Sequence, residues 1–241
     1  MFIHYRTLGL ILKKEDRGET DRLFVFFTRD FGKIEILAKA ERKIQSKLRV
    51  GLEIFNLADV EFIQGKTYKT LTDIYLIESF RNIKQDLGRL KTAYKIGEVL
   101  DKLVKGEEED KEIWRLSIDS FKKLDSPAFL KDNYFLIYYF FIWNLFSILG
   151  YTPEIYSCSI CQKKLYPGKL YFSPSEGGVI CSTCSGKIKK FKLVNDSFIK
   201  ILRIILKKDW STLKKLKFDE TQKKLLKDVS IFYLSFVTEQ D

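Results

Sequence analysis

Short apolar runs and alternating patterns fill the first eighty residues. Residues 58–62 alternate between apolar and acidic side chains, which is the period-two pattern of a strand with one buried face. Turn-forming residues separate the runs, at 17–21 for example, and no helical pattern is long enough to join parallel strands. The pattern predicts about five strands, at residues 7–12, 23–27, 34–36, 58–62 and 68–77. A chain of this kind closes best as a small barrel, and an OB-fold fits.

From residue 81 the apolar positions change to helical spacing. They predict one helix over 83–104 and a second over 114–121. The acidic run 107–110 lies just before the second helix, where the helix dipole favours negative charge. Ser126-Pro127 is predicted to start a third helix, with the proline in the first turn.

The third helix is unusually apolar. Residues 133–153 carry no charge, and this length approaches the roughly 20 residues that cross a bilayer. However, tyrosine, asparagine and serine dilute the stretch, and the neighbouring segments are amphipathic. We therefore predict the central helix of an all-α domain, with a membrane span as the alternative.

The C-terminal third is predicted to be helical as well. Asn195-Asp196-Ser197 forms a helix-capping sequence before apolar residues at helical spacing, and a last helix covers 225–236. The predicted fold class is therefore α+β, with an OB-fold-like barrel over 1–80 and a helical domain over 81–241. A cysteine-containing segment at about 151–190 is inserted in the helical domain.

Composition adds an uneven positive charge. The chain has 241 residues, 45% hydrophobic and 15% aromatic, which is ample for packed cores, and a formal net charge of +11. Residues 158–241 carry 17 Lys and Arg against 8 Asp and Glu, so most of the excess lies there. A basic protein attracts polyanions, most commonly nucleic acid, although a lysine-rich surface also serves solubility alone.

The four cysteines form two matched pairs, Cys158-x2-Cys161 and Cys181-x2-Cys184, separated by residues 162–180. Two such pairs joined by a hairpin are typical of a closed tetrahedral Zn²⁺ site, one ion per chain, with a structural role. Disulfides or free thiols are the alternative, but no secretory signal points to an oxidising compartment. A redox pair would need a βαβ context, and a catalytic zinc usually has histidine ligands, whereas the one histidine is His4.

A basic segment interrupts the predicted barrel between two strands. Its cations are Lys39, Arg42, Lys43, Lys47 and Arg49, opposed by Glu41. A basic loop of this kind can follow nucleic acid phosphates, and the alternative is a solvated charged loop. A second basic run, Lys187–Lys192, follows the cysteine segment.

The order of barrel, helices, four-cysteine ribbon and helices resembles the RecO family of bacterial recombination mediators. The resemblance covers nearly the whole chain and includes Gly18-Glu19-Thr20-Asp21, Thr28-x3-Gly32-Lys33, Ala38-Lys39 and Glu78. Its most specific stretch runs from Gly150-Tyr151-x-Pro153 through both cysteine pairs, with Phe172-Ser173 and Gly177-Gly178-x-Ile180 between them. Ala40 and Gln162 depart from the family pattern, since glycine is usual at both positions, and Glu35 is an acid where a basic residue could meet DNA.

The resemblance implies a non-enzymatic, bacterial, cytoplasmic and nucleoid-associated protein of DNA repair and homologous recombination. Such proteins bind single- and double-stranded DNA and anneal complementary strands. With RecR and single-strand-binding protein they help load RecA, and the acidic, apolar-tipped tail of single-strand-binding protein is expected to dock on the helical domain.

Other classes of protein are less favoured. A zinc nucleobase deaminase needs an H-x-E motif, which His4-Tyr5-Arg6 does not supply. A two-metal nuclease needs clustered carboxylates, and the densest group, Glu107–Asp110, is more simply a solvated helix start. A zinc-ribbon RNA-binding or transcription-associated module is the remaining alternative.

Overall fold

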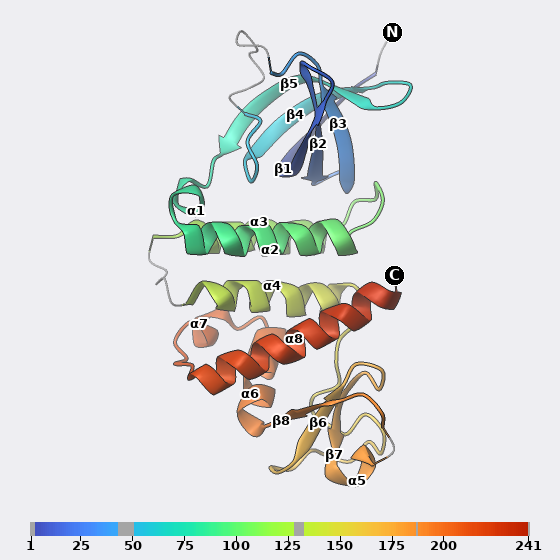
Figure 1. Ribbon diagram of the computed structural model, residues 1–241, viewed down its shortest axis with the longest axis vertical. Coiled ribbons are helices and arrows are strands. Elements are labelled where there is room, and N and C mark those ends of the chain that lie inside the picture. Colours follow the sequence, from blue (N-terminus) through green and yellow to red (C-terminus); the bar gives the residue numbers. More distant parts are fainter. Residues whose placement is uncertain (1–2, 43–50, 128–132, 187, 241) are drawn as a thin grey trace. The chain divides into compact units, whose positions relative to one another are not determined.

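The computed structural model (Figure 1) describes residues 3–42, 51–127, 133–186 and 188–240. The chain divides into two compact units, residues 1–134 and 135–241. Across the described ranges no helix is both long enough and apolar enough to cross a membrane. The predicted domain boundary near residue 80 follows the last barrel strand, and it stays a prediction.

Five strands form a closed barrel in the first unit (Figure 1). They are β1 (His4–Arg17), β2 (Asp21–Thr28), β3 (Lys33–Ala38), β4 (Leu57–Gln64) and β5 (Lys69–Glu78). Their order is β1-β2-β3-β5-β4, and β4 pairs back onto β1. The β3–β5 pairing is parallel and the others are antiparallel. The predicted OB-fold-like barrel is confirmed, with strands longer than the patterns that predicted them.

The barrel interior is filled by the apolar members of the alternating patterns. Eleven side chains form one buried cluster: Ile11, Phe24, Phe26, Ile34, Ile36, Ala38, Leu52, Ala58, Val60, Phe62 and Leu71. The β2–β3 turn is closed by Thr28, whose backbone N–H and hydroxyl both donate to the Gly32 carbonyl, at 2.7 and 2.9 Å. Gly32 has φ +56°, and a Cβ there would lie 2.4 Å from the Glu108 carbonyl oxygen. A side chain at this position is therefore excluded.

The described residues of the first unit also form three helices: α1 (Arg81–Gln85), α2 (Leu87–Leu103) and α3 (Lys111–Asp125). The prediction of one helix over 83–104 was wrong in one respect, because the chain breaks at Asp86. The Asp86 carboxylate accepts from the Arg89 N–H at 3.0 Å and caps α2. Asp110, the last acid of the predicted run, caps α3 in the same way.

The second unit is built around α4 (Tyr134–Ile148), with α6 (Asp196–Leu206), α7 (Trp210–Leu213) and α8 (Glu220–Gln240). In the described residues α4 begins at Tyr134, later than the predicted start at residue 126. Trp143 and Asn144 of α4 are fully buried. The Trp143 indole N–H donates to Ser230 Oγ at 2.9 Å, and the Asn144 amide donates to the Ile205 carbonyl at 3.1 Å. These bonds attach the central helix to α8 and α6.

The ribbon is a small sheet inserted between α4 and α6. It contains β6 (Leu170–Ser173), β7 (Gly178–Cys181) and α5 (Ser182–Ser185), and β8 (Lys192–Val194) extends the sheet just beyond the predicted limit. Strand β6 pairs with both β7 and β8, which confirms the predicted hairpin. The Phe172 ring of β6 packs against Trp143, Phe198 and Tyr233 of the surrounding helices. The insertion thus shares the apolar core of the helical unit.

Candidate metal centre

The first cysteine pair lies in a tight turn before the hairpin. The Gln162 N–H donates to the Cys158 carbonyl at 2.9 Å, and the Cys158 N–H donates to the Lys163 carbonyl at 2.8 Å. Gln162 has φ +60°, the left-handed conformation in which a side chain is strained. This backbone angle accounts for the expected glycine at the position. The turn directs Cys158 and Cys161 to the same side of the chain.

The second pair follows the hairpin. Cys181 ends β7, where it pairs with Leu170 of β6, and Cys184 lies in the short helix α5. The Ser159 N–H, inside the first turn, donates to the Val179 carbonyl of β7 at 2.9 Å. The hairpin therefore brings the two pairs together although 19 residues separate them in sequence.

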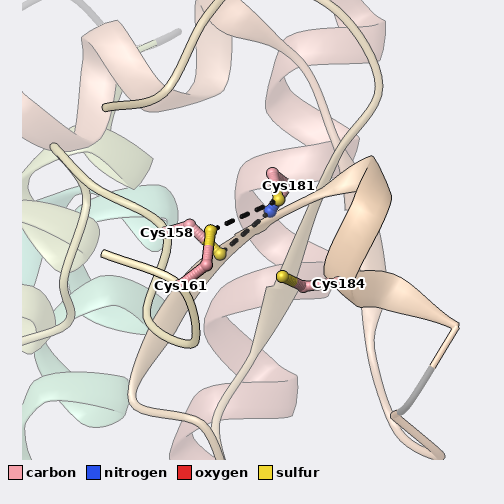
Figure 2. A group of neighbouring side chains, drawn as sticks. All are labelled: Cys158, Cys161, Cys181 and Cys184. Atoms are coloured by element: carbon pink, nitrogen blue, oxygen red, sulfur yellow. Dashed lines mark hydrogen bonds between the residues drawn. The ribbon is translucent and has the colours of Figure 1, made fainter. Parts of the chain in front are cut away.

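All four thiols face one centre (Figure 2), with their Sγ atoms within 4.8 Å of one another. Cys161 Sγ lies 3.9 Å from Cys181 Sγ, and the Cys181 N–H donates to Cys158 Sγ at 3.4 Å. Tetrahedral thiolates bonded to zinc at 2.3 Å lie about 3.8 Å apart. The sulfur positions therefore fit a four-thiolate metal ion, and the group could hold one.

The local electrostatics favour a thiolate at Cys158. Burial opposes ionisation of this thiol, but hydrogen bonds from the backbone N–H groups of Cys161, Cys181 and Ile160 outweigh it and lower its pKa to about 6. Hydrogen bonds with the other thiols, first with Cys181, raise the pKa of Cys184, so without an ion the group favours ionisation at Cys158 over Cys184.

No other cluster of metal-binding side chains occurs in the ranges that the structure describes. His4 lies on β1 in the other unit, where Nδ1 is 2.6 Å from Glu61 Oε1. The cysteine group therefore contains the ligand types of a structural site.

Sequence reasoning missed one residue that supports the centre. Glu154 Oε1 accepts hydrogen bonds from the N–H groups of Tyr156 and Ser157 at 2.6 and 2.9 Å. Its own backbone bonds to the hairpin turn, through the Gly177 carbonyl and the Val179 N–H, both at 2.8 Å. The carboxylate thus shapes the approach to Cys158. In the sequence, the signal for this role is limited to an acidic residue placed two and three positions before the N–H groups that it accepts from.

The basic barrel segment is described only at its start. Lys39 and Arg42 are exposed, whereas Lys43, Lys47 and Arg49 lie outside the described residues. Arg42 Nη1 lies 3.4 Å from Asp16 Oδ2, and the Arg42 backbone N–H donates to the Thr20 carbonyl at 3.0 Å.

Ala40 and Glu41, the next residues of the basic segment, contact the first residues of β2. Ala40 has φ +54°, and its N–H donates to Asp21 Oδ1 at 2.8 Å. Glu41, the opposing acid, is buried with Oε2 3.2 Å from Arg22 Nη1, and this contact lacks hydrogen-bond geometry. Glu41 therefore adds little negative charge to the surface of the segment.

A polar hollow of the first unit, about 340 Å³, is a poor site for a polyanion. Its two lysines are paired with acids: Lys33 with Asp101 at 3.3 Å and Lys69 with Glu107 at 2.6 Å. Glu35, on the same wall, adds a further acid. In the second basic run, Lys189, Lys190 and Lys192 are exposed, and Lys187 lies outside the described residues.

Comparison with known proteins agrees with this architecture. Residues 1–80 match the family model "Recombination protein O N terminal", and residues 84–241 match "Recombination protein O C terminal". The DNA repair protein RecO of Dehalococcoides mccartyi is 32% identical over 217 residues, which cover 89% of this chain and 83% of that protein. The DNA repair protein RecO of Desulfitobacterium hafniense is 28% identical over 234 residues, 95% of this chain and 83% of that protein. The chain belongs to the RecO family of DNA repair proteins.

Proposed function

We propose that this protein is a non-enzymatic recombination mediator. In this role it binds single- and double-stranded DNA, anneals complementary strands and, with RecR and single-strand-binding protein, helps load RecA. The observation that carries the proposal is a closed OB-fold-like barrel with a basic segment between β3 and β4, in a chain of the RecO family. Barrels of this type bind oligonucleotides on their open faces and loops.

The decisive experiment is an annealing assay on complementary strands coated with single-strand-binding protein. Addition of the full chain should accelerate duplex formation and leave both strands uncut. An RNA-binding or transcription-associated module would not accelerate annealing of coated DNA. Cleavage products would indicate an enzyme instead.

The metal of the four-thiolate group is inferred to be Zn²⁺, one per chain, bound by Cys158, Cys161, Cys181 and Cys184. Closed four-cysteine sites on hairpin ribbons prefer this ion, and all four sulfurs lie within 4.8 Å. When bound, the ion neutralises thiolate charge and crosslinks the two turns. Its role is therefore structural.

The proposed DNA contacts of the barrel are Lys39, Arg42, Lys43, Lys47 and Arg49. They would meet phosphates with little preference for sequence, since lysine and arginine on a loop neutralise backbone charge. Each contact to single-stranded DNA contributes roughly −0.7 to the salt slope, so five contribute about −3.5 together.

Charge reversal tests this segment. The double change Arg42→Glu and Lys43→Glu should weaken single-stranded DNA binding equally across sequences and flatten the slope by about 1.4. A matched control, Lys91→Glu with Lys102→Glu on α2, changes the net charge equally at two exposed lysines. If the two double variants weaken binding equally, the effect is due to net charge, and the basic segment is a solvated loop without DNA contacts.

For the acidic, apolar-tipped tail of single-strand-binding protein, we place the site beside α6. A hollow of about 240 Å³ is lined there by Ile201, Ile204, Leu216 and Phe218, with Lys200 and Lys217 at its rim. This combination suits an apolar side chain flanked by carboxylates. A synthetic tail peptide should bind with micromolar affinity and weaken with salt.

Two changes test this location. Ile204→Arg should abolish peptide binding by filling the hollow, and removal of the terminal apolar residue of the peptide should do the same. Undiminished binding to the Ile204→Arg protein would show that the tail docks elsewhere.

A further inference from the structure

Two tyrosines project from the ribbon in a way that packing does not explain. Tyr156 is 51% exposed and Tyr166 is 72% exposed, the highest value among the exposed large apolar side chains of the described residues. Aromatic rings carry a large apolar area and are usually covered. A single exposed ring needs no explanation, but these two lie on adjoining segments.

Backbone hydrogen bonds hold the segments of the two tyrosines side by side. The Leu165 N–H donates to the Tyr156 carbonyl at 3.2 Å, and Ser157 forms an antiparallel bridge with Lys164. The Tyr156 N–H is itself bonded to the Glu154 carboxylate. These bonds therefore fix the backbone from which both side chains extend.

A fixed cation lies over the Tyr156 ring. The guanidinium of Arg203, from α6, stacks over the Tyr156 ring at 4.6 Å from its centroid. It also donates to the Ile155 carbonyl from Nη2 and Nε, at 2.6 and 3.2 Å. Arg203 further lines a small hollow of about 120 Å³ together with Tyr166 and Pro167. Its position and charge are thus set before any ligand arrives.

The charge around the rings is mostly positive. Lys163, Lys164 and Lys169 are exposed on the same segment, whose nearest acids in sequence are Glu154, bonded to the Tyr156 N–H, and Glu176. Asp196, at the start of α6, is the acid that lines the hollow. A surface of aromatic rings and lysines is complementary to bases and phosphates.

We propose that Tyr156, Tyr166, Arg203, Lys163 and Lys164 form a second binding surface for single-stranded DNA, on the ribbon. Unpaired bases stack on the two tyrosine rings, and the lysines contact phosphates, as aromatic and basic side chains do in proteins that bind single strands. Bases in a duplex offer no free face, so this surface selects single strands. The inference rests on the proposed function and extends it to a second unit of the chain.

An acidic peptide is the less favoured occupant. A peptide that anchors an apolar side chain needs a deep hollow, whereas this one is small and has Asp196 on its wall. Tyr166 lines this hollow only in part, since it is 72% exposed, and Tyr156, 51% exposed, is not among the lining residues. Projecting rings suit flat ligands that stack.

The test uses the full chain and a labelled oligo(dT), with a blunt duplex of the same length as the second probe. Tyr166→Ala should weaken oligo(dT) binding by about tenfold, and Tyr156→Ala with Tyr166→Ala should weaken it further, because one stacked base contributes about 1–3 kcal/mol. Duplex affinity should change less than about twofold. Tyr166→Phe keeps the ring and should bind as the wild type does.

Two controls exclude trivial causes. Leu193→Ala removes another exposed apolar side chain, 59% exposed, and should leave both affinities unchanged. Metal content should equal that of the wild type in every variant, which shows that the ribbon is folded.

Several results would overturn the inference. They are unchanged oligo(dT) binding in the double variant, an equal loss for oligo(dT) and duplex, a Tyr166→Phe protein as weak as Tyr166→Ala, or a loss of tail-peptide binding in place of DNA binding. A wild-type protein that binds neither oligo(dT) nor the duplex would refute the proposed function itself. Failure of the proposed function is therefore distinct from failure of the second binding surface.

Discussion

The barrel and the ribbon are both small β-structures, but they are stabilised by different means. The barrel has five paired strands of up to 14 residues and a cluster of eleven buried apolar side chains. The ribbon strands β6 and β7 have four residues each, and β8 has three. Strands this short bury too little surface to be stable alone.

The difference predicts where each region is vulnerable. Stability in the barrel is spread over many side chains, so any one of them contributes a fraction of the total. The ribbon has apolar packing on the helices through Phe172, and beyond it four sulfurs within 4.8 Å, which act as one unit when they share an ion. Loss of one sulfur should therefore affect the ribbon more than loss of one core ring affects the barrel.

The largest expected effect comes from the metal ligands. Cys161→Ser should lose stoichiometric zinc and unfold the ribbon, because thiolate zinc sites in small folds supply about 10–16 kcal/mol of apparent binding energy, much of it folding energy. Elemental analysis measures the first effect. Hydrogen exchange resolved by segment measures the second, with protection lost in β6 and β7 and retained in β2.

The matched control for this change is Ser159→Ala, which lies in the same turn and supplies no sulfur. It should keep its zinc and the protection of both regions. Equal loss of protection in β2 and β6 on Cys161→Ser would contradict the comparison, since the two regions would then unfold as one.

The second prediction attacks the barrel. Phe26→Ala should lower the free energy of unfolding by about 3–5 kcal/mol, because the ring is fully buried and a cavity would remain. The folded fraction of the Phe26→Ala protein should still contain one zinc ion per chain. Phe191→Ala, at a partly exposed ring, should cost less than about 1 kcal/mol in a denaturant titration. Zinc loss from the Phe26→Ala protein would show that the stability of the ribbon depends on that of the barrel, against the comparison.

The sequence predicted most of the barrel and the cysteine group because both leave a local signal. Alternation marks a strand, and C-x2-C spacing places two sulfurs on one turn. The break at Asp86 was missed since apolar residues keep helical spacing across it. The cap that causes the break is a contact to the Arg89 N–H, which the spacing does not reveal.

The features that sequence reasoning missed in the ribbon depend on tertiary contacts. In the sequence Glu154 has no feature that distinguishes it from other acids, and its role depends on contacts with the hairpin turn that only the fold creates. Tyr156 and Tyr166 would be assigned to a core on composition alone, and only the fold shows them exposed.

The third prediction concerns the hydrogen bonds at Glu154. Glu154→Ala should destabilise the ribbon by about 1–2 kcal/mol, because two backbone N–H groups lose a charged acceptor. Glu154→Gln keeps an acceptor oxygen and should lose less. The comparison is sharpened if protection falls in β7 but not in the barrel, as measured by segment-resolved hydrogen exchange.

The same bonds give a pH dependence. Burial opposes ionisation of Glu154, but the N–H groups of Ser157 and Tyr156 outweigh it and hold its pKa below the ordinary 4.5. A depressed pKa stabilises the folded state above that ordinary value, and the contribution disappears as the pH falls through the folded-state pKa. The gap between wild type and Glu154→Ala should therefore be largest near neutrality and close in acid. A gap that widens in acid would contradict the assignment.

The smallest expected effect concerns two residues with left-handed backbone angles, Ala40 at the barrel and Gln162 in the ribbon. Ala40 and Gln162 hold φ values of +54° and +60°, a conformation that glycine adopts without strain. A left-handed residue with a Cβ costs about 1–2 kcal/mol, and the added freedom of glycine in the unfolded chain returns part of this. Ala40→Gly should therefore stabilise the barrel, and Gln162→Gly the ribbon, by about 0.5–1 kcal/mol each. Ala38→Gly, two residues away in a strand of ordinary geometry, should destabilise instead. Denaturant titrations of the three proteins decide the matter, and a loss of stability in Ala40→Gly would show that the left-handed angle is not the source of strain.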